Sequence, residues 1–217
     1  MIVLLFGVEG TFQLTTSNLR VDTAFALIPA GVLHTLNFHG QRTLVVYVEP
    51  HDPIYASLHL GAQGQCQVQR AFSSELQSAI KNWDDTRSLD ELVGALVSTH
   101  GKRGATLDGR LQSICEHFNQ GDWLTEDSEH LAEYVDLSPS RFLHLLKAEL
   151  GVGTRRLKQH YRFKILVREV ARGCTFTQAA HSAGFADSAH LSRAFVETFG
   201  LPPTHALTDG ILIEIVD

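Results

Sequence analysis

Two stretches in the second half of the chain constrain its fold more than any other feature. Each contains a short helical pattern, a tight turn and a second amphipathic helical pattern, in "SEHLAEYVDLSPSRFLHLLKAEL" and "TFTQAAHSAGFADSAHLSRAFVETF". Small Ala132 and Ala180 allow the two helices of each pair to cross closely. Asp136 and Gly184, four positions later, are residue types that tolerate a positive φ. This is the helix-turn-helix layout, whose second helix can enter the major groove of DNA.

In the second helix of each motif, apolar residues recur at helical spacing and predict a packed stripe: Phe142, Leu145, Leu146 and Leu150, then Leu191, Ala194, Phe195 and Phe199. The residues off these stripes are the candidate DNA-binding residues: Ser140, Arg141, Leu143, His144, Lys147, Ser188, Ala189, His190, Ser192 and Arg193. Short polar side chains allow close approach to base edges, arginine can donate two hydrogen bonds to guanine, and alanine or leucine can contact a thymine methyl group. Two alternatives stay open: Arg193 binds a carboxylate of its own domain, or His144 and His190 are merely solvated.

Capping residues predict where these helices begin and end. Thr125 or Ser128 is expected to cap the first helix of the first motif, Ser138 its second helix, and Asp187 the last helix. Between the motifs, "TRRLKQHYRFKILVREVA" predicts a helix of about 18 residues, or roughly 27 Å. Successive major grooves on one face of DNA are about 34 Å apart, so this helix can nearly span the distance between two of them.

The net charge of −6 argues at first against a nucleic-acid partner. The charge is distributed unevenly, however: residues 137–193 contain ten basic and three acidic residues, a net charge of +7, which leaves −13 for the rest of the chain. Because fields between exposed charges fade within about 8–10 Å, local charge decides what a surface binds. The basic residues of the connecting helix are therefore expected to favour a position near phosphates.

The first 50 residues predict strands instead of helices. Short apolar bursts such as "IVLLFGV" and "TLVVYVEP" are separated by Gly, Asn, Asp and Pro at the spacing of an antiparallel sheet or barrel. Helical spacing then returns within residues 73–100, and residues 100–106 have the composition of a linker. The expected fold is α+β with two domains: a partial antiparallel β-barrel plus helices, then an all-α domain with two helix-turn-helix motifs joined by a long helix.

The second half of the chain resembles the AraC/XylS family of bacterial transcription regulators. The resemblance covers about residues 107–206 and rests on "LSPSRFLHLLKAELGVG", on Arg162 and on "AGFADSAHLSRAFVETFGLPP". It implies that Ser140, Leu143 and His144 of the first motif face DNA, as do Ser188, Ala189, His190, Ser192 and Arg193 of the second. Two positions depart from the family pattern: Arg155 follows Thr154 where relatives often have proline, and Asp136 stands where they often have a small residue.

The first half resembles, more weakly, the small cupin-like sensor domain of the same family. "IPAGVLHTLN" is similar to the second cupin motif, with Pro29, Gly31, His34 and Asn37. The His-x-His pair and Glu of the first cupin motif are not found upstream, so we expect no metal site and no cofactor. His34 is expected to line a small ligand pocket or to bond the barrel's own backbone. A shortened barrel also leaves an edge strand open, which favours a homodimer formed there or through the helices at 73–100.

Together these features divide the chain into a shortened cupin-like sensor or dimerisation domain (1–60), a helical connector and linker (61–106), an AraC-type DNA-binding domain (107–208) and an apolar tail (209–217). Three dispersed cysteines and the lack of a long apolar run predict a cytoplasmic protein with no membrane segment. The leading hypothesis is a transcription regulator without enzymatic activity and without catalytic residues. Its expected partners are double-stranded DNA, with RNA polymerase and a small-molecule effector as further candidates. The alternatives are a cupin-type metalloenzyme and a helical module that binds protein.

Overall fold

The computed structural model describes residues 1–52, 54–72, 80, 106–199 and 202–203. The chain divides into two compact units, one of residues 1–112 and 144–152 and one of residues 113–143 and 153–217. The helices expected between residues 73 and 100, the linker that follows them and the tail at 209–217 lie outside the described residues.

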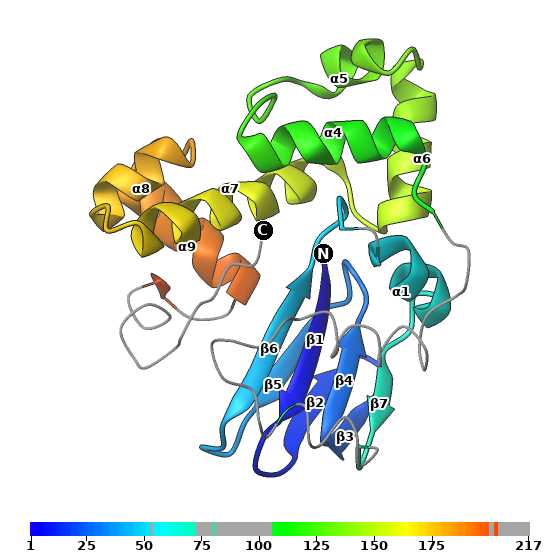
Figure 1. Ribbon diagram of the computed structural model, residues 1–217, viewed down its shortest axis with the longest axis vertical. Coiled ribbons are helices and arrows are strands. Elements are labelled where there is room, and N and C mark those ends of the chain that lie inside the picture. Colours follow the sequence, from blue (N-terminus) through cyan, green and yellow to red (C-terminus); the bar gives the residue numbers. More distant parts are fainter. Residues whose placement is uncertain (53, 73–79, 81–105, 200–201, 204–217) are drawn as a thin grey trace. The chain divides into compact units, whose positions relative to one another are not determined.

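The first unit is built on two antiparallel sheets (Figure 1). One sheet has the order β6-β1-β4-β7 and the other the order β3-β2-β5. The strands are β1 (Ile2–Gly7), β2 (Phe12–Thr16), β3 (Arg20–Thr23), β4 (Phe25–Ile28), β5 (His34–Asn37), β6 (Thr43–Val48) and β7 (Gln67–Gln69). The expected antiparallel β domain is therefore confirmed.

The hydrophobic pattern explains where these strands lie. β1 and β4 are almost continuous apolar runs, pair with each other from Val3↔Ile28 to Phe6↔Phe25, and are buried on both faces. In β5, by contrast, half-buried and exposed residues alternate, as in a strand with one face toward solvent. Side chains of both sheets meet in one core cluster, made of Leu5, Phe12, Leu14, Ala26 and Ile28.

Two elements of this unit, α1 and β7, were not predicted from the sequence. α1 (Tyr55–Ala62) begins after Asp52, whose carboxylate accepts a hydrogen bond from the backbone N–H of Ile54 at 3.0 Å. Within the expected helical connector and linker (61–106), β7 is a strand that pairs with β4 and extends the sheet. The "QVQ" of β7 is too short and too polar to give a strand signal, and only its pairing with β4 makes it a strand.

The second unit consists of helices. They are α4 (Gly109–Gln120), α5 (Ser128–Tyr134), α6 (Pro139–Leu150), α7 (Thr154–Ala171), α8 (Phe176–Ser182) and α9 (Ser188–Phe199), and the division between the units falls within α4 and within α6. The predicted 18-residue connecting helix is confirmed as α7, and Pro139 is the first residue of α6 as expected. The cap predicted for α5 is wrong: Asp127, and not Thr125 or Ser128, accepts the backbone N–H groups of Glu129 and His130.

Candidate nucleic-acid interface

The two predicted turns have the same backbone hydrogen bonds. Between α5 and α6, Asp136 N–H donates to the Glu133 carbonyl and Leu137 N–H to the Ala132 carbonyl. Between α8 and α9, the corresponding donors are the N–H groups of Gly184 and Phe185, and the acceptors are the carbonyls of residues 181 and 180. This is the Schellman arrangement, which requires a left-handed residue after the helix. Asp136 (φ 54°) and Gly184 (φ 75°) are that residue.

Replacement of Gly184 by alanine is expected to lower the free energy of unfolding by about 1–2 kcal/mol, the cost of a left-handed residue with a Cβ. A Cβ there would lie 3.6 Å from the nearest atom, Arg162 Nε, so the cost is conformational and not steric. Urea unfolding measures it. In the control Asp136→Gly, relief of left-handed strain and loss of chain entropy roughly cancel, so a change of less than about 0.5 kcal/mol is expected. Equal losses in both variants would contradict this account.

α7 holds the second motif through an aromatic core. The Phe163 ring is 5.5 Å from Phe185, 5.4 Å from Phe195 and 5.1 Å from Phe199, measured between ring centroids. Gln159, which sequence reasoning did not single out, donates through Nε2 to the Ala194 carbonyl and to the Thr198 hydroxyl. The orientation of α9 on α7 is therefore fixed by both packing and hydrogen bonds.

The same helix holds the start of the first motif through basic side chains. Lys158 donates to the Glu126 carbonyl, Arg162 Nη2 to the Leu124 carbonyl at 3.2 Å, and Arg168 Nη2 to the Asn119 carbonyl at 2.9 Å. Burial lowers the pKa of the Lys158 ammonium, and the neighbouring Arg162 charge adds to this effect. Three of the basic residues of α7 are therefore engaged with backbone carbonyls within the protein, which the sequence did not predict.

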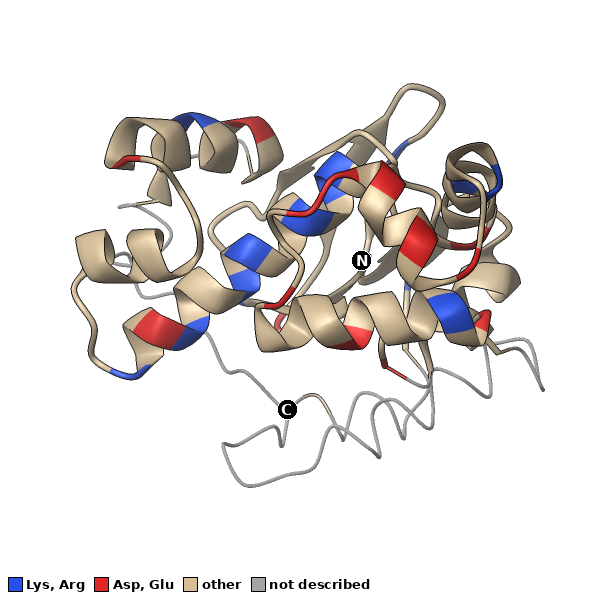
Figure 2. Cartoon of the chain, turned by 90° about the horizontal axis from the view of Figure 1, so that it is seen from above, with Lys and Arg blue, Asp and Glu red and all other residues tan. Residues whose placement is uncertain are grey.

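Six of the seven remaining basic side chains in residues 137–193 fall into two groups. Among the described residues, the side chains of Arg141, Arg155, Arg156 and Arg193 are not engaged in an ion pair or hydrogen bond, and all four are exposed. Lys147 Nζ, by contrast, donates to the Gly151 carbonyl at the end of its own helix, and Arg172 is paired with Glu169 at 2.9 Å. Figure 2 shows basic residues placed at intervals along α7. The alternative that Arg193 binds a carboxylate of its own domain finds no support among the described residues.

Counted from their N-caps, α6 and α9 present matching exposed positions. Ser138 caps α6 and Asp187 caps α9, each by accepting a backbone N–H, as the sequence predicted. Relative to these caps the equivalent pairs are Ser140 with Ala189, Leu143 with Ser192, and His144 with Arg193. Of these six side chains only Ser192 is half-buried, and Leu143 is 43% exposed although it is large and apolar. Each helix thus presents a small side chain at the first of these positions and a long basic or polar side chain at the third. At the second position the two helices differ, with leucine in α6 and serine in α9.

Two predicted site residues are engaged locally instead. The His190 ring accepts a hydrogen bond from the Ala186 N–H at 3.4 Å and lies edge-on to the Phe185 ring, so it supports the start of α9. His34 Nδ1 lies 2.9 Å from the Val32 carbonyl oxygen. This matches the expectation that His34 bonds the barrel's own backbone.

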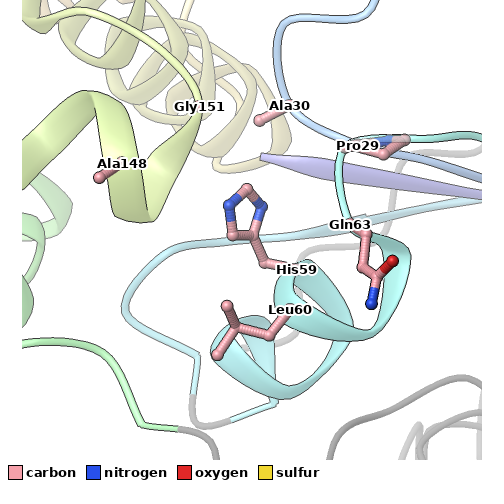
Figure 3. Close-up of a pocket in the computed structure, with 8 residues that line it drawn as sticks. Pro29, Ala30, His59, Leu60, Gln63, Ala148 and Gly151 are labelled. Carbon is pink, nitrogen blue, oxygen red and sulfur yellow. The ribbon is translucent and has the colours of Figure 1, made fainter.

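The first unit contains a cavity of about 530 Å³ beside α1, which Figure 3 shows in close-up. His34 is not among the residues that line it. Its walls are formed by Pro29, Ala30, His59, Leu60, Gln63, Gly64, Ala148 and Gly151. Burial lowers the pKa of His59, and a hydrogen bond to the Ala148 backbone acts in the opposite direction. The cavity therefore combines apolar walls with an imidazole and an amide.

Within the described part of the chain, no group of three or more His, Cys, Asp or Glu residues is arranged to hold a metal ion. No helix in the same residues is both long and apolar enough to span a membrane.

Comparisons with known proteins agree with this geometry. Residues 131–208 match a family described as "Helix-turn-helix domain". A curated protein of Streptomyces lividans, "Putative AraC-like transcription regulator", is 24% identical over 208 residues, which are 93% of this chain but only 62% of that protein's length. Apo ToxT from Vibrio cholerae superposes with a TM-score of 0.69 at 16% identity, covering 95% of this chain and 88% of that one. ToxT bound to an unsaturated fatty acid gives 0.67 at 14% identity, covering 98% and 89%. The ToxT structures show that the fold is shared.

Proposed function

We propose that this chain, whose second half is an AraC/XylS-type helix-turn-helix domain, is a sequence-specific DNA-binding transcription regulator that acts in the bacterial cytoplasm. The observation that carries the proposal is the matching pair of helices α6 and α9, each following the same Schellman turn and each presenting exposed residues at equivalent positions. Two such helices read two successive major grooves when a connecting helix of suitable length holds them. α7 is that helix.

Base recognition is assigned to the exposed residues of α6 and α9. The guanidinium groups of Arg193 and Arg141 have no partner among the described residues and can donate two hydrogen bonds to guanine. Leu143 and Ala189 can contact thymine methyl groups. Ser140, Ser188 and Ser192 allow the helices to approach closely, and His144 reaches the base edge from the position equivalent to Arg193. Lys147 and His190, which are engaged within the protein, contribute less.

Phosphate contacts are assigned to Arg155 and Arg156, in the first turn of α7. Both are exposed and neither has a partner among the described residues, in contrast to Lys158, Arg162 and Arg168 of the same helix. Free basic side chains release counterions from DNA when they bind, and this makes affinity depend on salt.

The first unit is proposed to sense a small-molecule effector. The cavity beside α1 supplies a volume of about 530 Å³ with largely apolar walls, which suits a small organic ligand. Relatives of the same fold include a ToxT structure with a bound unsaturated fatty acid, which supports a ligand-sensing role here. The edge strands of the two sheets have no further strand partner among the described residues, and we include dimerisation through this unit in the proposal.

The deciding experiment is selection of bound fragments from genomic DNA of the source organism, followed by sequencing and by titration of the enriched site against random DNA. A regulator of this kind is expected to bind its site about 10³-fold or more tightly than random DNA at physiological salt. Equal affinity for both would overturn the proposed function.

Removal of both free arginines of α7, Arg155→Ala with Arg156→Ala, is expected to flatten the slope of log affinity against log salt concentration by about 2, since each phosphate contact contributes about 0.9. The loss is expected on specific and random DNA alike. Fluorescence anisotropy titrations at several salt concentrations measure the slope. The control Arg172→Ala removes a guanidinium already paired with Glu169, so its slope should match the unmodified protein. An unchanged slope in the double variant would remove these two residues from the interface.

A further inference from the structure

The two recognition helices are held by different parts of the chain. α9 belongs entirely to the second unit, where Leu191, Ala194 and Phe195 are buried in a cluster with residues of α7 and α8. α6 is divided: residues 139–143 belong to the second unit, and residues 144–150 are counted with the first unit. The carboxyl-terminal half of a DNA-reading helix is thus a structural part of the unit that contains the β-sheets.

A fully buried tyrosine of α1 contacts the end of α6. Tyr55 has no exposed surface, and its hydroxyl donates to the Leu150 carbonyl at 3.3 Å. That carbonyl is one of the last four of the helix, which have no partner within it. The Tyr55 ring also stacks on the His59 ring, with 5.6 Å between centroids and 10° between planes. The His59 ring belongs to the same contact region: its Nδ1 is buried without a hydrogen-bond partner among the described residues, and Figure 3 shows the ring between α1 and the end of α6.

Two further contacts fix the same helix end. Gly31 and Gly151 allow two backbone segments to lie close together. A Cβ atom added at Gly31 would lie 3.1 Å from the Gly151 carbonyl oxygen, and a Cβ atom added at Gly151 would lie 3.1 Å from the Ala30 carbonyl oxygen. The Glu149 carboxylate accepts the backbone N–H of Asp108 at 2.7 Å. The end of α6 therefore contacts α1, the β4–β5 loop and the segment before α4.

A helix transmits such a constraint along its length because its backbone is rigid. α6 has 12 residues, about 18 Å, so any tilt or rotation at Leu150 also moves Ser140 to His144. Base-specific hydrogen bonds depend strongly on distance and angle, so a small change in helix orientation reduces discrimination between bases.

We propose that Tyr55, supported by His59, is a positioning residue for DNA recognition: it sets the orientation of the first recognition helix and leaves the second unaffected. The proposal rests on the proposed function and extends it, because it assigns the first unit an effect on one half of the DNA site only. A ligand or substitution that moves α1 then alters the sequence preference read by α6 and not the preference read by α9.

The test compares Tyr55→Phe with Tyr47→Phe in the full chain. Tyr47 is a half-exposed tyrosine of β6 without a hydroxyl partner among the described residues, so its variant controls for loss of a tyrosine hydroxyl in the same unit. The variants His144→Ala and Arg193→Ala first assign which bases of the selected site are read by α6 and which by α9. Affinity is then measured for the intact site and for sites altered in one half.

Tyr55→Phe is expected to lose about fivefold in discrimination at the α6 half-site, the effect of one buried hydrogen bond, with no change at the α9 half-site. Tyr47→Phe should match the unmodified protein at both. Because Tyr55→Phe could destabilise the first unit, Glu149→Ala is a second variant: it loosens the same helix end without altering α1, and should give the same one-sided loss. Far-ultraviolet circular dichroism and thermal unfolding report whether each variant is folded.

Equal losses at both half-sites, or no loss in either variant, would overturn the positioning role while leaving the proposed function intact. If the proposed function is wrong, the unmodified protein binds the selected site and random DNA equally well. That result is distinct from the outcomes above, and it would remove the premise of the positioning role.

Discussion

Replacement of Phe163 by alanine is expected to lower the free energy of unfolding by about 3–5 kcal/mol. Phe163 is 3% exposed and contacts three other phenylalanine rings, from the turn before α9 and from α9 itself. Alanine leaves a cavity at the centre of that cluster, and packed interiors close such cavities only in part. Because α9 rests on this cluster, its half of the DNA site should be lost with it.

Urea unfolding followed by circular dichroism measures the change. The control is Val196→Ala, which removes an exposed apolar group from α9 itself and is expected to change stability by less than about 0.5 kcal/mol. A loss below about 1 kcal/mol in Phe163→Ala would mean that the aromatic cluster does not hold α9 in place.

Replacement of Arg193 by alanine is expected to weaken binding to the selected DNA site by about 1–3 kcal/mol, roughly 5- to 150-fold, while binding to random DNA changes little. Arg193 is exposed, has no partner among the described residues, and follows the α9 cap by the same interval as His144 follows the α6 cap. A base contact is lost only on the sequence that supplies the base, whereas a phosphate contact is lost on any DNA.

Competition titrations with specific and random DNA separate these outcomes. Arg42→Ala is a suitable control, since Arg42 is an exposed arginine of the first unit that lies 3.8 Å from a Glu9 carboxylate oxygen. Equal weakening on both DNAs would reassign Arg193 to a phosphate, and no weakening on either would place it outside the interface.

Much of the second half of the chain could be predicted from local sequence. Helix caps, Pro139 at the start of α6 and a residue that tolerates positive φ in each turn are local signals, and the structure confirms Ser138, Asp187, Asp136 and Gly184 in these roles. The 3.6-residue spacing of apolar residues likewise predicted which face of α9 is buried. Asp127 was missed because several capping residue types follow one another in "TEDS", and only the backbone geometry decides among them.

The use of the basic residues could not be predicted in the same way. The sequence shows ten positive charges in one window, but it does not show that Lys158, Arg162 and Arg168 donate to carbonyls of the α4–α5 region. Nor does it show that Arg155 and Arg156 find no partner in the part of the chain that the structure describes. These carbonyls lie 32 to 49 residues away along the chain. Composition therefore overestimated the number of side chains available to phosphates.

The sequence by itself determined the helix-turn-helix plan, the strand character of the first 50 residues and the surfaces of α6 and α9 that face away from their cores, because caps, turns and hydrophobic periodicity act over a few residues. The tertiary structure alone decided which charges are free, that "QVQ" becomes a strand by pairing with β4, and that Tyr55 binds the end of α6, 95 residues away. Contacts of that kind depend on how distant segments meet, and no local pattern encodes them.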